Sequence, residues 1–174
     1  MLRHQLEHLI RACADLTDED DIVVVGSQAI HGSHADPPPS LLLSIEADVY
    51  PRDRPDRADL IDGAIGEGSP FHSEFEYYAH GVGPETAKAP HGWEQRLVAL
   101  STPNTRGATG WCLEAHDLVL AKCVAGREKD WAFAAEAIRH GIVALVELEA
   151  RVADLPVDRG ARDAIAQHLE ALGD

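Results

Sequence analysis

Basic residues, cysteines, aromatic residues and long apolar runs are all scarce in this chain of 174 residues. The formal net charge of −15 argues against a general nucleic-acid surface, which needs Lys and Arg to neutralise phosphates. Three scattered cysteines exclude a disulfide framework and a zinc site, and they favour a reducing cytoplasm. The apolar runs are too short to predict a membrane span, and the first residues lack the apolar core of a signal peptide.

Aliphatic residues are plentiful and predict a folded chain with a core of its own. Hydrophobic residues make up 45% of the sequence and aromatic residues only 5%, so the expected core consists mainly of Leu, Val, Ile and Ala. Predicted strands come first along the chain and helices last, which is typical of an α+β fold with a small mixed sheet and a helical C-terminal part. We place the boundary between residues 1–112 and 113–174. The expected helices are 2–16, 27–33, 56–65, 114–126, 127–141, 143–154 and 158–172, and the expected strands are 22–25, 41–50, 73–79, 96–101 and 107–113.

Two acidic side chains share one face of the predicted strand 41–50. Glu46 and Asp48 are two residues apart, so they point the same way with backbones roughly 7 Å apart. Side chains of this length converge on one hard cation, and Mg²⁺ prefers one or two carboxylates together with substrate phosphates. The alternative is a solvated strand face with no metal.

A glycine and a serine follow the apolar strand at residues 22–25. Backbone amides at Gly26 and Ser27 are placed to hold a phosphate, and the serine hydroxyl adds a donor. The segment is neither a Walker loop nor a dinucleotide-binding fingerprint, because no Gly-Lys-Ser/Thr and no G-x-G-x-x-G is present. The alternative is a tight strand-to-helix turn.

In this order, the two motifs resemble the signature of the nucleotidyltransferase (polymerase-β-like) superfamily. The stretch LEAHDLVLAKCVAGREKD is similar to the Lys-then-Arg-x-x-Asp segment of minimal nucleotidyltransferases related to the abortive-infection and toxin–antitoxin group. Together with SIEADVYPR, GEGSPFH and GVGPETA, it makes the chain resemble the bacterial DUF6036-type family over roughly residues 20–140. The resemblance implies a nucleotidyltransferase core in residues 1–112.

The resemblance also implies roles for individual residues. Gly26 and Ser27 would hold the triphosphate, and Glu46 and Asp48 would bind Mg²⁺. Lys122 would contact phosphate or the base-side pocket with Arg127 nearby, and Asp130 would support the site or serve as a catalytic carboxylate. The chain departs from the superfamily pattern at Glu46, where Asp is more common, and its third carboxylate has no position fixed by a motif. Glu74 and Glu76 share one face of the predicted strand 73–79, and either could serve. His4, Glu7 and His8 match an H-x-x-E-H zinc pattern but are assigned to the solvated face of a helix, and other histidines such as His72, His80 and His116 have no ligand spacing and are assigned to the surface or to capping.

Lys122 also stands out without any resemblance. It lies in LVLAKCVA, which is otherwise apolar, so its ammonium group must either reach solvent or meet an anion. Arg127 and Asp130 follow within the next helix start, where a salt-bridged helix N-terminus is the alternative interpretation.

These observations lead to three hypotheses. The first is a cytoplasmic, Mg²⁺-dependent enzyme that transfers a nucleoside monophosphate from a nucleoside triphosphate to an acceptor hydroxyl. The negative charge favours a protein or a small molecule over RNA as the acceptor. The second hypothesis is a binding or regulatory protein with this fold but without turnover. The third is a toxin–antitoxin component whose acidic surface binds a partner protein.

Overall fold

The computed structural model describes residues 1–173. Five strands form one mixed sheet in the order β3-β2-β1-β5-β4, in which β2–β3 and β1–β5 are parallel and β1–β2 and β4–β5 are antiparallel. This architecture confirms the α+β prediction. The elements are α1 (Arg3–Thr17), β1 (Asp21–Val24), α2 (Ile30–Ser33), β2 (Glu46–Pro51), α3 (Ala58–Ile65), α4 (Pro70–Phe75), β3 (Tyr78–Gly81), β4 (Val98–Leu100), β5 (Thr109–Cys112), α5 (Ala115–Ala125), α6 (Glu128–Arg139), α7 (Leu145–Val152) and α8 (Arg159–Gly173).

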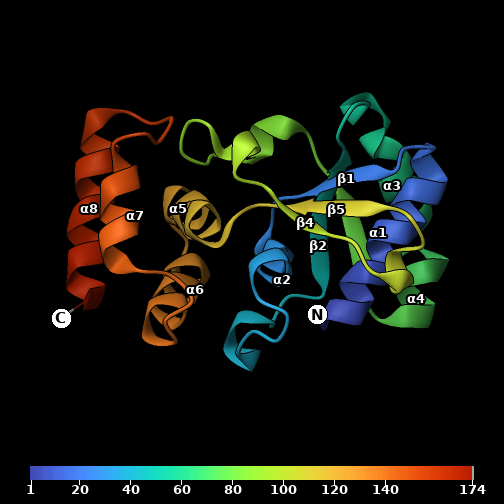
Figure 1. The fold of residues 1–174 in the computed structure, drawn as a ribbon, viewed down its shortest axis with the longest axis horizontal. Coiled ribbons are helices and arrows are strands. Elements are labelled where there is room, and N and C mark those ends of the chain that lie inside the picture. Colours follow the sequence, from blue (N-terminus) through green and yellow to red (C-terminus); the bar gives the residue numbers. More distant parts are fainter. Residues whose placement is uncertain (174) are drawn as a thin grey trace.

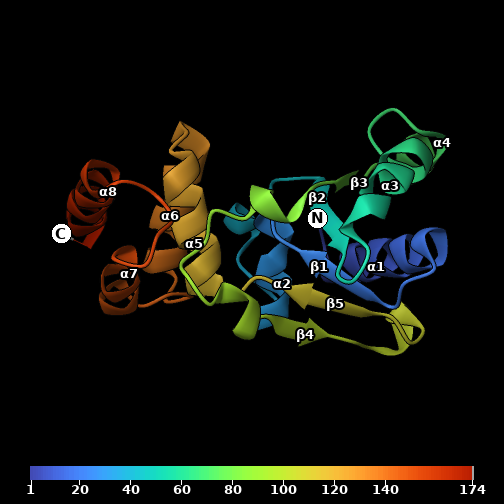
Figure 2. The ribbon, with the colours of Figure 1, turned by 90° about the horizontal axis from the view of Figure 1, so that it is seen from above.

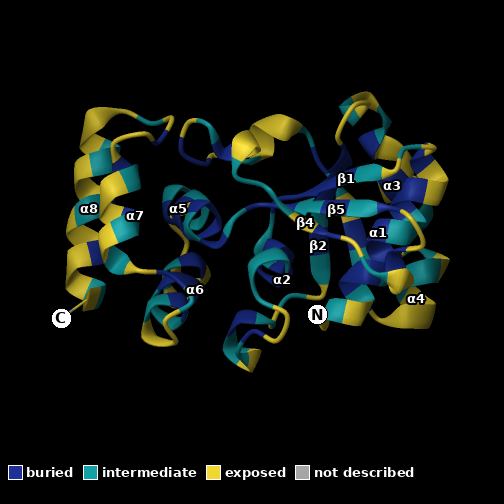
Figure 3. Ribbon diagram, viewed as in Figure 1, coloured by how far each residue is buried: buried dark blue, intermediate teal, exposed yellow. Residues whose placement is uncertain are grey.

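Alternation along β2 separates a buried face of the sheet from a polar one. Ala47 and Val49 are fully buried on the face that packs against α1 and α3. Their neighbours Glu46 and Asp48 are only partly buried and project from the opposite face. The helices α5–α8 gather beyond one end of the sheet, away from α1, α3 and α4 (Figures 1 and 2). The outer surfaces of α4, α7 and α8 are largely exposed (Figure 3).

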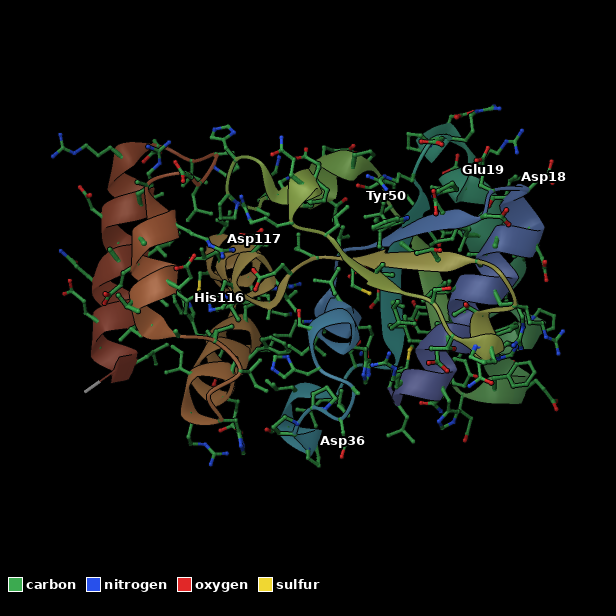
Figure 4. The ribbon with its side chains drawn as sticks, in the orientation of Figure 1. Asp18, Glu19, Asp36, Tyr50, His116 and Asp117 are labelled. Atoms are coloured by element: carbon green, nitrogen blue, oxygen red, sulfur yellow. The ribbon has the colours of Figure 1, made fainter. Side chains whose placement is uncertain are left out.

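A buried ion cluster attaches α5 to its surroundings. Asp117, which projects from α5 together with His116 (Figure 4), is fully buried. Its carboxylate accepts hydrogen bonds from Arg96 at 2.7 and 3.1 Å and from Arg151 of α7 at 2.9 Å. Because a buried carboxylate is costly unless it is paired, this cluster specifies how α5 sits against α7 and the segment before β4.

Two predicted strands are wrong in part. The strand expected at 41–50 begins only at Glu46, and Leu43 is 84% exposed. The short 3₁₀ turn η2 (Pro39–Leu41) and a hydrogen bond from the Glu46 amide to Ser44 Oγ occupy the preceding backbone, and such local bonds compete with a strand ladder. The strand expected at 73–79 begins at Tyr78, because residues 70–75 form α4. Ser69 caps that helix by accepting from the His72 amide.

No helix among residues 1–173 is both long enough and apolar enough to cross a membrane. The same described residues contain the three cysteines as free, buried thiols. Burial raises the pKa of Cys112 and of Cys123 to about 12. These side chains therefore behave as small apolar core residues.

Candidate functional site

Glu46 and Asp48 project side by side from β2, as the strand period predicts. Their side chains are about one third exposed, at 36% and 29%. Burial and the neighbouring negative charge of Asp48 raise the pKa of Glu46 above its usual value. Burial is the larger cause, and the repulsion from the second carboxylate is the part that a bound cation would relieve.

A histidine that the sequence analysis assigned to the surface completes this cluster. Nδ1 of His80 lies 3.0 Å from Glu46 Oε1 and 3.1 Å from Asp48 Oδ1. The three residues each offer one ligand atom, and these atoms lie within 4.8 Å of one another. Burial opposes the charged imidazole, but the hydrogen bond to Asp48 and the surrounding carboxylates raise the pKa of His80.

The register of the sheet places His80 in this position. Strand β3 runs parallel to β2, with Asp48 opposite His80 and Glu46 opposite Tyr78. The Tyr78 hydroxyl donates to Glu46 Oε2 at 3.4 Å. The sequence does show Tyr78 and His80 at strand spacing, but it does not show which strand lies next to β2.

Glu74 and Glu76, the sequence candidates for a third carboxylate, lie elsewhere. Glu74 is on α4, and Glu76 follows that helix in a left-handed conformation with φ of 62°. Both are exposed and neither belongs to the cluster of Glu46, Asp48 and His80. The expectation that they share a strand face is wrong because the helix N-capped by Ser69 occupies that part of the chain.

Gly26 brings its backbone directly against Asp48. The Val25 amide donates to the Asp48 carbonyl at 3.0 Å, and the chain then turns into the 3₁₀ turn η1 (Ser27–Ala29). A Cβ atom at Gly26 would lie 2.1 Å from Asp48 Oδ2. The close approach, and not the backbone angle of φ −78°, is the reason for glycine here. The carboxylate pair and the Gly26–Ser27 turn are therefore neighbours.

A second charged group forms where α5 ends and α6 begins. Lys122 Nζ lies 3.4 Å from Asp130 Oδ1, and Arg127 Nε lies 2.7 Å from Asp130 Oδ2. The Lys122 ammonium also lies 4.7 Å from the centre of the Phe133 ring. The Asp130 side chain is fully buried and that of Lys122 is 13% exposed, whereas Arg127 is 61% exposed. Gly126, at φ 67°, ends α5 and lets the chain turn directly into α6.

Burial and ion pairing act against each other in this second group. Burial lowers the pKa of Lys122 although Asp130 opposes the shift. The hydrogen bonds and charge of Asp130 raise the pKa of Arg127, and the charges of Asp48 and Glu46 raise it further. Arg127 therefore lies within Coulombic range of the carboxylate pair, and α5 packs against η1 beside that pair.

Arg127, which shares the buried Asp130 with Lys122, is the member of this second group that senses the charge of the two carboxylates. Carboxylates of this kind hold a divalent cation, and exposed guanidinium groups bind phosphate oxygens. Opposite charges on two adjoining groups fit a ligand that is itself a cation–polyphosphate pair. The structure brings Asp48, with Glu46 on the same strand face, against the Gly26–Ser27 turn, and Lys122, Arg127 and Asp130 form a separate group.

The family model described as "Nucleotidyltransferase of unknown function (DUF6036)" matches residues 4–158. No curated protein and no solved structure shows significant similarity to the chain.

Proposed function

The chain belongs to the nucleotidyltransferases of unknown function (DUF6036). From this premise we propose that it transfers a nucleoside monophosphate from a nucleoside triphosphate to an acceptor hydroxyl. The proposed reaction needs Mg²⁺ or a similar divalent cation. The observation that carries the proposal is the contact between the Asp48 carboxylate and Gly26, with Glu46 alongside. This contact unites a cation-binding group and a phosphate-binding turn.

Glu46 and Asp48 hold the cation in this proposal. Their donor atoms fit the group, because hard carboxylate oxygens on one strand face leave the remaining coordination positions to phosphate and water. When bound, the cation neutralises the phosphates and stabilises the attacking and leaving oxygens of an in-line displacement. The backbone at Gly26 and the hydroxyl of Ser27 contact the triphosphate beside Asp48.

Lys122 and Arg127 bind the negative charge that develops on the phosphates. Both are held by Asp130, so we assign Asp130 to positioning these two cations. Because Asp130 is fully buried, it keeps its two partners oriented before substrate arrives. The side chains of Lys122 and Arg127 thus lose their conformational entropy when the protein folds, and they lose little more when substrate binds.

The acceptor in this proposal is a protein or a small molecule. A net charge of −15 disfavours approach of a polyanion such as RNA, whereas a neutral or basic acceptor meets no such repulsion. Glu46 and Asp48 are joined by a histidine and not by the third carboxylate of the superfamily pattern, which favours a second candidate function, in which a nucleotide binds without being turned over. A regulatory protein or a toxin–antitoxin component would act in this way.

The test combines nucleotide binding with release of pyrophosphate. Purified protein is incubated with Mg²⁺ or Mn²⁺ and each of the four nucleoside triphosphates, and melting temperature and pyrophosphate are measured. We expect at least one nucleotide to raise the melting temperature and to release pyrophosphate. Asp48→Asn should lower release about 100-fold or more, because it removes a charged ligand.

Glu74→Gln is the matched control, since it removes an exposed carboxylate outside the cluster. It should behave as the wild type. The transferase proposal is wrong if no nucleotide stabilises the protein and none releases pyrophosphate with either ion. Stabilisation without pyrophosphate, in the presence of candidate acceptors, supports the non-catalytic alternative.

A further inference from the structure

The cluster on β2 and β3 has a mixed set of donor atoms. Two are carboxylate oxygens, from Glu46 and Asp48, and the third is Nδ1 of His80. Nδ1 approaches Glu46 Oε1 at 3.0 Å and Asp48 Oδ1 at 3.1 Å, so one nitrogen faces an oxygen from each carboxylate. A small shift of these side chains would place all three atoms around one ion.

Neighbouring contacts hold the three donors in this arrangement. The Tyr78 hydroxyl donates to Glu46 Oε2, and the other oxygen, Oε1, lies nearest to His80. Parallel pairing of β2 with β3 fixes Asp48 opposite His80 in the backbone. Outer contacts that orient a ligand commonly change metal affinity by about 10- to 100-fold, so the tyrosine is part of the site.

We propose that His80 is the third protein ligand of the metal site and that it makes the site prefer Mn²⁺ over Mg²⁺. The inference rests on the proposed function and deepens it by naming the ion. Mg²⁺ favours an all-oxygen environment and dehydrates reluctantly, whereas imidazole nitrogen suits transition metals. Mn²⁺ accepts both carboxylate and imidazole, and it also binds the phosphate oxygens of a nucleotide.

A purely structural role for His80 is the competing interpretation. Its side chain is 50% exposed, and an ion pair this open to solvent contributes little to stability. A structural role therefore predicts a small loss of stability in His80 variants and no change in the order of metal affinities. A ligand role predicts that His80 variants keep the fold but change the relative affinities of the site for different metal ions.

The test measures metal binding to the full chain without nucleotide. Mn²⁺ binding is followed by the electron paramagnetic resonance signal of free Mn²⁺, and Mg²⁺ binding by calorimetry and by competition with Mn²⁺. His80→Ala should weaken Mn²⁺ binding at least about tenfold. His80→Asp replaces the nitrogen donor with a carboxylate oxygen, so that all three donors are oxygens. The preference for Mn²⁺ over Mg²⁺ should then fall at least about tenfold relative to the wild type.

His72→Ala is the matched control. His72 lies in α4 with its ring 4.6 Å from that of Tyr78, but it is not one of the three donors. It should leave both affinities unchanged. Circular dichroism and melting temperature establish that each variant is folded, and each His80 variant is compared with the wild type separately, so one folded variant is enough for the test.

The outcomes separate this inference from the proposed function. Mn²⁺ affinity that is unchanged in His80→Ala, or a Mn²⁺ preference that is unchanged in His80→Asp, overturns the ligand role. Pyrophosphate release can persist in either case and would leave the transferase proposal intact. Conversely, Mn²⁺ binding that depends on His80, without pyrophosphate release under any condition, supports the ligand role and removes the transferase.

Discussion

Gly26→Ala adds a single methyl group, which would meet the side chain of Asp48. The backbone at Gly26 has φ −78° and ψ −165°, which alanine also adopts, so the substitution introduces no conformational strain. The added methyl carbon would lie 2.1 Å from Asp48 Oδ2, 2.9 Å from Cγ and 3.2 Å from Cβ. The first distance is more than about 1 Å shorter than a comfortable separation of non-bonded atoms, so the carboxylate must move.

The expected cost falls on activity much more than on stability. Asp48 is partly exposed and can change its χ1 angle, and a strained or changed rotamer costs about 1 kcal/mol of unfolding free energy. A displacement of about 1 Å in a group that positions substrate costs about 100-fold in rate. We therefore expect Gly26→Ala to fold, to lose about 1 kcal/mol, and to lose most metal-dependent nucleotide binding and pyrophosphate release.

Urea unfolding and metal-dependent binding of nucleotide test this reasoning together. Gly63→Ala is the control, because nothing lies within 4 Å of a Cβ at that position in α3, and alanine there should stabilise the helix by about 0.5–1 kcal/mol. In an Asp48→Ala background, Gly26→Ala should cost less than it does alone, since the clashing oxygen is gone. Wild-type nucleotide binding in Gly26→Ala would refute the contact between Gly26 and Asp48 as the basis of the site.

Three further predictions concern the ion pairs and the thiols. Burial opposes the charge on Asp130, but hydrogen bonds from Arg127 and the charge of Lys122 lower its pKa. The ionised Asp130 carboxylate therefore stabilises the fold above the ordinary carboxyl pKa, and this stabilisation is lost as pH falls through the lowered pKa. The difference in unfolding free energy between the wild type and Asp130→Asn, measured in urea, should shrink below about pH 4. A difference that stays constant with pH would contradict this. Arg151→Ala should lower the free energy of unfolding by about 2 kcal/mol, because Arg151 donates hydrogen bonds to Glu114, Asp117 and Glu147 at 2.7–2.9 Å. The control Arg159→Ala removes a side chain that is 93% exposed and should lower it by less than about 0.5 kcal/mol in the same urea assay. Equal losses would contradict the role of the ion cluster. The buried cysteines should react with a thiol reagent only after denaturation, and any equivalent titrated in the native protein would contradict their burial.

Periodic patterns in the sequence identify the long elements correctly. Apolar residues at helical spacing mark α1, and Gly126 marks the end of α5 because a left-handed residue follows the last turn. These signals are local, since each depends on residues within one or two turns of one another. The carboxylate pair is equally local, because strand period alone puts Glu46 and Asp48 on one face.

Pairing between strands is the information that the sequence does not carry. The histidine at position 80 has no nearby partner along the chain, and it meets Asp48 across 32 residues only because β3 adds to β2 in parallel. A different, local cause explains the choice of Glu74 and Glu76, which alternate as in a strand although Ser69 and Pro70 start a helix in that segment. Local propensity decided that segment against a strand pattern of only a few residues.

Because strand pairing supplies His80, the candidate site depends on the sheet as a whole. Asp48 is held from one side by the backbone of Gly26, which continues β1, and it faces His80 of β3 on the other side. Because β2 is the central strand of this β1–β2–β3 group, a one-residue slip of β3 would turn His80 away from the carboxylates and bring a buried alanine position to the surface. The apolar face of β3, with Ala79 fully buried beneath α1 and α3, therefore selects the register that brings His80 to Glu46 and Asp48. The packing of the core and the geometry of the candidate site thus have a common cause.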